Sequence, residues 1–195
     1  VGEPGSARSI SMIEATLEAE KPDLVVFTGD IVVKAPTKQG WDEVLATVIK
    51  RNIPYLVTFG NHDDESEMKR QEVAGYVVSK SGILQKNAKV EGVEGFLNQA
   101  VTILDRSGKA GAIIYAMDSR AYSTNERVKG YGWFDHSQVN WFVRTSAGFR
   151  QQYGQPLPAL AFFHIPLPEY KTAFDQMGNK RLGVRYENEC APEIN

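Results

Sequence analysis

Three short apolar stretches each run into polar residues of types that bind metal ions. They are Leu24–Phe27 before Asp30, Tyr55–Phe59 before Asn61-His62-Asp63, and Ala159–Phe163 before His164. Carboxylate, amide and imidazole groups together form a mixed oxygen and nitrogen ligand set, which suits manganese, iron or zinc better than calcium or magnesium. If the stretches are strands of a parallel α/β sheet, their carboxyl ends form one ligand crevice and these side chains converge there.

The intervening sequence predicts a unit that would bring two of these ends together. Five residues recur at the spacing of an amphipathic helix: Trp41, Val44, Leu45, Val48 and Ile49. Pro54 ends this helix, and Tyr55–Phe59 then has the continuous apolar character of a buried strand. Strand, helix and strand in this order form the βαβ unit of a parallel sheet. The glycines before Asp30 and Asn61 permit a sharp turn directly after each strand.

The remaining patterns predict a layered α/β fold in one domain over residues 1–195. The expected elements are a helix containing Ile10, Ile13 and Leu17, a weaker helix at Glu65–Ser79, a hairpin of Val101–Asp105 with Gly111–Asp118, a helix at Ser137–Gly148, and a strand at Ala159–Phe163. The helix at Ser137–Gly148 should direct Trp141 and Phe142 toward the core. We expect no regular element after the last strand, and no repeat or linker divides the chain.

The composition is that of a soluble globular protein and argues against several functional classes. Hydrophobic residues make up 42% and charged residues 24%, and the net charge is −2, so nothing attracts the chain to nucleic acid or to an anionic membrane. The apolar stretches are too short to span a bilayer, and Val1–Ser11 has no signal-peptide pattern. Cys190 is the single cysteine, which excludes an internal disulfide and a cysteine-based zinc cluster. The sequence has no Gly-x-Ser-x-Gly motif and no P-loop.

Two polar segments together resemble the central motifs of the calcineurin-like metallophosphatases. Gly29-Asp30 and Gly60-Asn61-His62-Asp63 follow two buried strands around a helix, and a later strand ends in His164. The segments Tyr131-Gly132-Trp133-Phe134 and Phe162–Tyr170 are similar to the single-domain branch of this family that is related to plant purple acid phosphatases. The resemblance covers nearly the whole chain.

This resemblance implies a metal-dependent phosphoesterase with two divalent or trivalent ions of manganese, iron or zinc. Asp30 would bridge the two ions, and Asn61 and His164 would bind the second. A metal-bound hydroxide would attack a phosphomonoester or phosphodiester in line with the leaving oxygen. His62 would face the small-molecule or phosphorylated substrate and protonate the leaving oxygen, with Asp63 as its orienting partner.

The sequence departs from the family pattern in ways that affect the first metal site. An Asp-x-His motif is expected before Asp30 and a Gly-His-x-His motif after His164, and neither occurs. We expect the chain to be truncated at both ends, so that this segment alone would bind metal poorly and catalyse little. The alternative is a non-catalytic member of the family that serves as a binding module. Val33 stands where purple acid phosphatases place a tyrosine, which argues against a purple di-iron site.

The candidate residues also have ordinary structural interpretations. Asp30 could be a turn residue, Asn61 a helix N-cap and His164 a hydrogen-bonded residue at a strand end. Their joint position after three apolar stretches favours the metal site.

His136 is expected to be structural or solvent-facing. Asp118-Ser119 could line the cleft or cap a loop, and four more residues could contact substrate: Arg120, Tyr122, Tyr170 and Arg185. The resemblance favours an extracytoplasmic setting.

Overall fold

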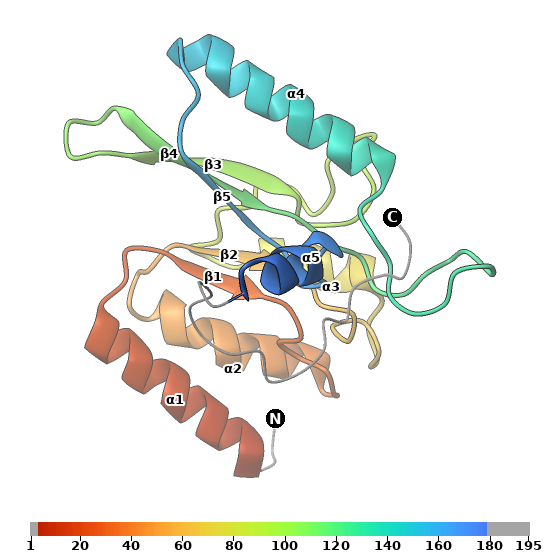
Figure 1. Cartoon of the computed structure of the whole chain (residues 1–195). Coiled ribbons are helices and arrows are strands. Elements are labelled where there is room, and N and C mark those ends of the chain that lie inside the picture. The colour runs from red at the N-terminus through yellow and green to blue at the C-terminus, as the bar shows by residue number, and fades with distance from the viewer. Residues whose placement is uncertain (1–3, 179–195) are drawn as a thin grey trace.

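The computed structural model describes residues 4–178 of the chain and contains two β-sheets flanked by helices (Figure 1). The elements in chain order are α1 (Pro4–Glu20), β1 (Val25–Thr28), α2 (Thr37–Ile49), β2 (Tyr55–Thr58), α3 (Arg70–Val78), β3 (Gln99–Leu104), β4 (Ala110–Ala116), α4 (His136–Tyr153), β5 (Ala159–Phe162) and α5 (Glu169–Gln176). Figure 1 shows α1 and α2 below the first sheet and α4 above the second. The arrangement is a layered α/β fold, as the sequence predicts.

The first sheet is the predicted βαβ unit. β1 and β2 pair in parallel, from Val25 opposite Tyr55 to Thr28 opposite Thr58, and α2 forms the crossover between them. All four residues of β2 are buried, which explains their continuous apolar character. Both strands therefore end at the same edge of the sheet, where the chain continues into Asp30 and Asn61.

The second sheet has the order β3-β4-β5. β3 and β4 form the predicted antiparallel hairpin, and β5 lies parallel to β4, with Ala116 opposite Phe162. The side chain of Asp105 stabilises the hairpin turn because it accepts hydrogen bonds from the backbone amides of Ser107 and Lys109. As a result, β5 carries the chain to His164 at the same end of the sheet as Asp118.

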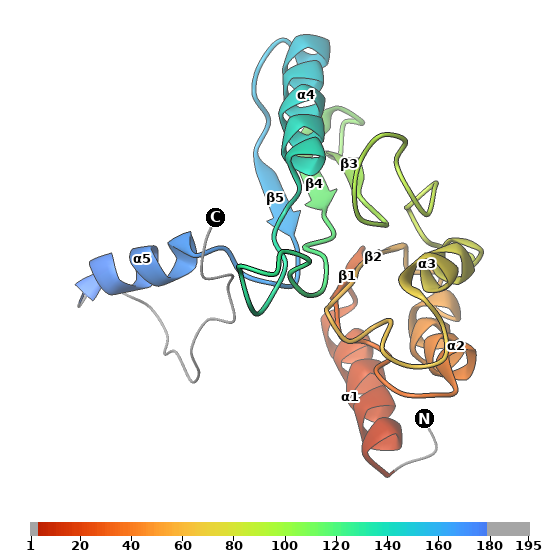
Figure 2. The same cartoon turned by 90° about the vertical axis from the view of Figure 1, so that its right-hand side faces the viewer.

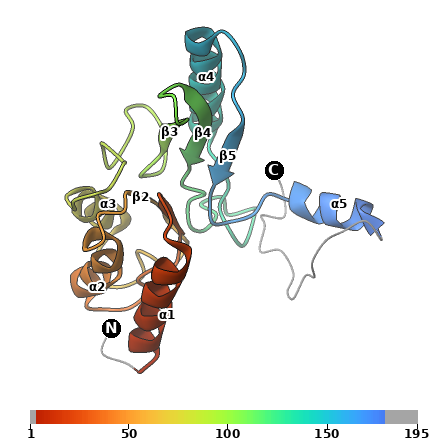
Figure 3. The ribbon, with the colours of Figure 1, turned by 90° about the vertical axis from the view of Figure 1, so that its left-hand side faces the viewer.

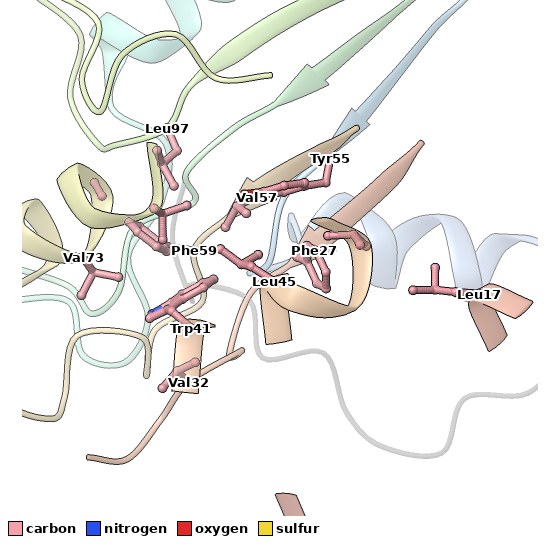
Figure 4. Packing of buried hydrophobic residues seen from close by; sticks show 13 residues of the cluster. Leu17, Phe27, Val32, Trp41, Leu45, Tyr55, Val57, Phe59, Val73 and Leu97 are labelled. Atoms are coloured by element: carbon pink, nitrogen blue, oxygen red, sulfur yellow. The ribbon is translucent and has the colours of Figure 1, made fainter. Parts of the chain in front are cut away.

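The larger apolar core lies between the first sheet and the helices α1, α2 and α3. Trp41 and Leu45 of α2 are fully buried against Phe59, which follows β2, and Val73 of α3 (Figure 4). The rings of Trp41 and Phe59 meet edge to face with centroids 6.2 Å apart. This packing fixes the C-terminal end of β2, from which the chain continues into Asn61 and His62.

A second core joins β4 to α4. Ile113, Tyr115 and Met117 are buried there, and the Tyr115 ring contacts Trp141 and Phe142 at centroid distances of 6.3 and 4.7 Å. The predicted core-facing positions of the two aromatic residues on α4 are therefore confirmed. Each sheet therefore packs against a different set of helices. The first core holds β1 and β2, and the second core holds the sheet that contains β5.

Three helices differ from the sequence predictions. α3 begins at Arg70 rather than Glu65, and the side chains of residues 65–67 instead bind distant residues, namely Tyr122 and Thr37. α4 continues through Gly148 and ends at Gly154, whose φ of 72° supplies the left-handed C-terminal residue. The expectation of no regular element after the last strand is wrong, because α5 follows β5. This helix has no buried residue and stands apart from the other helices in Figures 2 and 3.

Tyr55 buries its hydroxyl group without a hydrogen-bond partner among residues 4–178, and this burial raises the pKa of Tyr55 to about 12. Such a group costs roughly 1–3 kcal/mol relative to a paired one. We therefore expect Tyr55→Phe to raise the free energy of unfolding by about 1 kcal/mol, as measured by urea denaturation. Because the edge contact with Phe27 needs only the ring, a loss of stability in the variant would contradict this reading.

Candidate metal centre

The ends of β1, β2 and β5 meet at one place. A Cβ atom on Gly29 would lie 2.5 Å from the Gly60 nitrogen and 2.6 Å from Nδ1 of His164. Gly29 also has a φ of 101°, which side chains rarely permit. The three strand ends therefore approach each other closely because Gly29 and Gly60 have no side chains.

Asp30 and His164 face each other across this meeting point. Asp30 Oδ2 lies 3.3 Å from Nε2 of His164, and Nδ1 of His164 lies 2.9 Å from the carbonyl oxygen of Thr28. Because a carbonyl only accepts hydrogen bonds, Nδ1 carries a proton. In the neutral ring, Nε2 then presents its lone pair to a carboxylate oxygen, an arrangement that suits a cation bound by both atoms.

Asn61 is the third predicted ligand, and its neighbours on both sides contact Asp30. The amide of His62 donates to Asp30 Oδ1 over 3.0 Å, and a Cβ on Gly60 would lie 2.0 Å from the same oxygen. The Asn61 residue is only 4% exposed. Its Nδ2 donates to the hydroxyl of Tyr122 over 2.9 Å, which leaves the amide oxygen as the atom that can bind a cation.

Asp63 has a different role from the one predicted for it. Its buried carboxylate accepts hydrogen bonds of 2.8–3.1 Å from four backbone amides: those of Asp30, Ile31, Val32 and Gly60. Burial raises the pKa of Asp63, while the four amides oppose this shift. Asp63 thus joins the loop after β1 to the loop after β2. The prediction that Asp63 orients the ring of His62 is corrected: Glu65 makes that contact.

Glu65 is the hydrogen-bond partner of His62, a contact that the sequence did not predict. Its Oε2 accepts from Nδ1 of His62 over 2.5 Å, and its Oε1 accepts from the Tyr122 hydroxyl over 2.7 Å. The hydrogen bond that His62 donates to Glu65 raises the pKa of His62, and the charge of Asp30 adds to this effect. The signal in the sequence was an acidic residue three positions after a histidine. The protonated, donating form of His62 is therefore favoured.

We expect Glu65→Gln to lower the pKa of His62 in the metal-free protein. The raised pKa means that the His62–Glu65 pair stabilises the fold fully below the ordinary histidine pKa of about 6.5. This contribution is lost as the pH rises through the raised value. An NMR titration is practical because the chain has three histidines, and His136, exposed at the start of α4, is the internal reference. An unchanged His62 pKa in the variant would contradict the assignment.

A buried ion pair holds the second sheet against the site. The guanidinium of Arg70 contacts Asp118 through Nη2–Oδ1 at 2.6 Å and Nε–Oδ2 at 3.2 Å, and it donates to Asp64 and the Gly60 carbonyl at 2.9 Å. Asp118, considered in the sequence as a cleft-lining or capping residue, is 1% exposed. This ion pair therefore anchors the second sheet, through Asp118 after β4, to Arg70 of α3 and the Gly60 carbonyl next to the candidate site.

The other candidate substrate contacts occupy different surroundings. Tyr122 lies beside His62, with ring centroids 6.4 Å apart. Tyr170 is exposed on α5 and contacts Phe163. The backbone amide of Arg120 donates to Asp118. Arg185 and Cys190 lie outside the described residues.

Three residues of this chain, Asp30, Asn61 and His164, could offer atoms to one cation. Within residues 4–178, no three His, Cys, Asp or Glu side chains form a group that could hold a metal ion. The set instead combines two such residues, Asp30 and His164, with the amide of Asn61. In the same described range, no helix is long and apolar enough to cross a membrane.

A sequence model of the calcineurin-like phosphoesterase family matches residues 3–188. The chain belongs to this family. The match includes all three strand ends at the candidate site. The motifs that carried the resemblance in the sequence therefore identify the family correctly.

Curated relatives of this calcineurin-like phosphoesterase include plant and yeast proteins. The chain is 34% identical over 197 residues to the probable inactive purple acid phosphatase 29 of Arabidopsis thaliana, which covers 92% of this chain and 50% of the relative. For the probable inactive purple acid phosphatase 14 of the same plant, the identity is 30% over 209 residues, with 95% and 51% covered. The phosphatase DCR2 of Saccharomyces cerevisiae is 32% identical over 200 residues, with 95% and 34% covered. The chain thus spans about half the length of the first two relatives and a third of the other.

Proposed function

We propose that this calcineurin-like phosphoesterase hydrolyses phosphomonoesters or phosphodiesters with the help of bound metal ions. The observation that carries the proposal is the opposition of Asp30 Oδ2 and Nε2 of His164, with Nδ1 of His164 already committed to the Thr28 carbonyl. With Nδ1 bound to the Thr28 carbonyl, Nε2 of His164 and Oδ2 of Asp30 are the two atoms that could both bind a cation placed between them. Family membership and the polar edge formed by Asn61, His62 and Glu65 support the same conclusion.

Asp30, Asn61 and His164 would hold one ion, and further ligands for a second ion would come from outside the described residues. Manganese, iron or zinc suits this mixed oxygen and nitrogen set. When bound, such ions supply Lewis acidity toward phosphoryl oxygens and an activated water. The Thr28 carbonyl fixes the tautomer of His164, and the four amides around Asp63 fix the loop that presents Asp30.

His62 is the proposed general acid. Glu65 accepts its Nδ1 proton over 2.5 Å, so Nε2 is the ring atom left to face a phosphoryl or leaving oxygen. The raised pKa keeps a proton on Nε2 at higher pH than in an ordinary histidine. The imidazolium would then donate that proton to the departing alkoxide of the substrate.

A non-catalytic binding module is the second candidate. Two observations favour it: relatives carry the words "probable inactive" in their names, and the chain contains neither Asp-x-His nor Gly-His-x-His. In that case the ligands would still hold an ion, but the protein would turn over no phosphoester.

The decisive experiment combines Mn²⁺ binding with turnover of para-nitrophenyl phosphate and its bis-ester. We expect Asp30→Ala and His164→Ala to lose both Mn²⁺ and activity. His62→Ala should keep Mn²⁺ and lose activity by roughly 10²–10⁴-fold, while His136→Ala serves as the control that keeps both. Because this segment lacks both motifs and is itself expected to catalyse little, Mn²⁺ binding without turnover would support the binding module only in a longer chain that carries them. Equal Mn²⁺ binding by Asp30→Ala would overturn the site.

A further inference from the structure

We propose that Tyr122 is a positioning residue that sets the orientation of the Asn61 amide and thereby the metal affinity of the site. This inference rests on the proposed function, because it assigns Asn61 its place as a metal ligand. Tyr122 would not touch the ion or the substrate. It would act through hydrogen bonds to Asn61 and Glu65.

The hydroxyl oxygen of Tyr122 lies at the centre of three polar groups. Glu65 Oε1 is 2.7 Å away, Asn61 Nδ2 is 2.9 Å away and Nδ1 of His62 is 3.5 Å away. The same Glu65 carboxylate holds the ring of His62 through its other oxygen. One hydroxyl group therefore connects a proposed metal ligand to the proposed general acid through a shared carboxylate.

Counting donors and acceptors fixes the direction of these hydrogen bonds. An ionised carboxylate only accepts, so the single hydroxyl proton of Tyr122 goes to Glu65. The Tyr122 oxygen can then only accept from Asn61, which requires the NH₂ end of the amide on that side. The opposite end, Oδ1, is consequently presented away from Tyr122. Without the hydroxyl, the amide would be free to rotate by half a turn and present NH₂, which cannot bind a cation.

Tyr122, which is exposed, reaches the site from the loop of residues 121–132 in the second half of the chain. Residues 122 and 131 form an isolated antiparallel bridge, and their rings stack with centroids 5.8 Å apart and planes 24° apart. Two further backbone hydrogen bonds close the loop, from Ser123 to Gly130 and from Gly132 to Ala121. This loop holds the ring in place, so replacement by phenylalanine should remove the hydroxyl and keep the fold.

The test measures Mn²⁺ affinity by titration calorimetry in a double-mutant cycle of Tyr122→Phe and Asn61→Ala. We expect Tyr122→Phe to weaken Mn²⁺ binding about 10-fold, within the range known for groups that orient metal ligands. In the Asn61→Ala background the same change should have no further effect, since no amide remains to be oriented. Tyr76→Phe is the matched control, because it removes another tyrosine hydroxyl bound to a carboxylate, that of Asp42 on α2.

The outcomes separate this inference from the proposed function. Weakened binding in Asn61→Ala together with unchanged binding in Tyr122→Phe would overturn the inference and leave the metal site intact. Unchanged binding in Asn61→Ala would overturn both the ligand assignment and the inference. An equal loss from Tyr122→Phe in both backgrounds would show a general structural effect and would also overturn it.

Discussion

Replacing Arg70 by methionine should lower the free energy of unfolding by about 3–5 kcal/mol, the loss seen when one partner of a buried ion pair is removed. The side chains of Arg70 and Asp118 are 11% and 0% exposed. Within residues 4–178, the variant would leave the buried Asp118 carboxylate with the amides of Phe96 and Arg120 as its donors. It would also remove the hydrogen bonds to Asp64 and Gly60, next to the candidate site.

Chemical denaturation of this variant should be compared with that of Lys171→Met. Lys171 pairs with Asp175 four residues along α5, and both side chains are at least half exposed, so the control should lose less than about 1 kcal/mol. Adding Asp118→Asn to Arg70→Met should recover part of the loss, because the buried charge is removed as well. Similar losses from Arg70→Met and Lys171→Met would refute the anchoring role.

Gly29→Ala should be similarly damaging, with a loss of about 2–5 kcal/mol from two separate causes. A left-handed conformation costs an alanine about 1–2 kcal/mol, and overpacking adds about 1–3 kcal/mol. The added methyl group would meet the Gly60 backbone at 2.5 Å and Nδ1 of His164 at 2.6 Å. Since the backbone cannot move aside easily, His164 should be displaced, and Mn²⁺ affinity should fall together with stability.

Gly130→Ala separates the two causes. Gly130 has a φ of 92°, close to the 101° of Gly29, but a Cβ there would meet no heavy atom within 4 Å. The control should therefore show only the conformational cost, about 1–2 kcal/mol. If thermal or urea denaturation finds the two variants equally stable, the close approach of the three strand ends is not what requires glycine at position 29.

The first sheet could be predicted from local patterns alone. The spacing of Trp41, Leu45 and Val48 defines α2, and the continuous apolar run at residues 55–58 matches a strand that is buried throughout. Asp30 and Asn61 come shortly after these two parallel strands, which end at the same edge of the sheet. The approach of Asp30 and Asn61 was therefore predictable. The prediction placed the strand before His164 in the same parallel sheet as the other two, whereas β5 lies beside β4 in the second sheet. The approach of His164 to Asp30 therefore depends on how the two sheets sit together, which periodicity does not indicate.

The partners of the site residues could not be predicted, because they depend on contacts between distant segments. Asp63 binds four backbone amides, and backbone amides carry no signal in the sequence. The predicted helix begins at Glu65, whereas in the structure the Glu65 carboxylate contacts His62 nearby and the distant Tyr122. Tyr122 lies 61 positions from Asn61. Gly148 resembled a helix terminus, but helix packing against β4 continues beyond it, and Gly154 ends α4.

The hydrogen bond from His164 to Thr28 also has a consequence for the order in which the protein is made. This bond closes a loop of 136 residues, whereas the bonds from Asp63 to the loop after β1 close loops of 31–33 residues. The longer closure costs about 1 kcal/mol more in chain entropy, and during synthesis β5 emerges long after β1 and β2. We therefore expect Asp30 and Asn61 to approach each other during synthesis before His164 has been made. A tightly held ion would consequently mark a chain that has been translated and folded through residue 164.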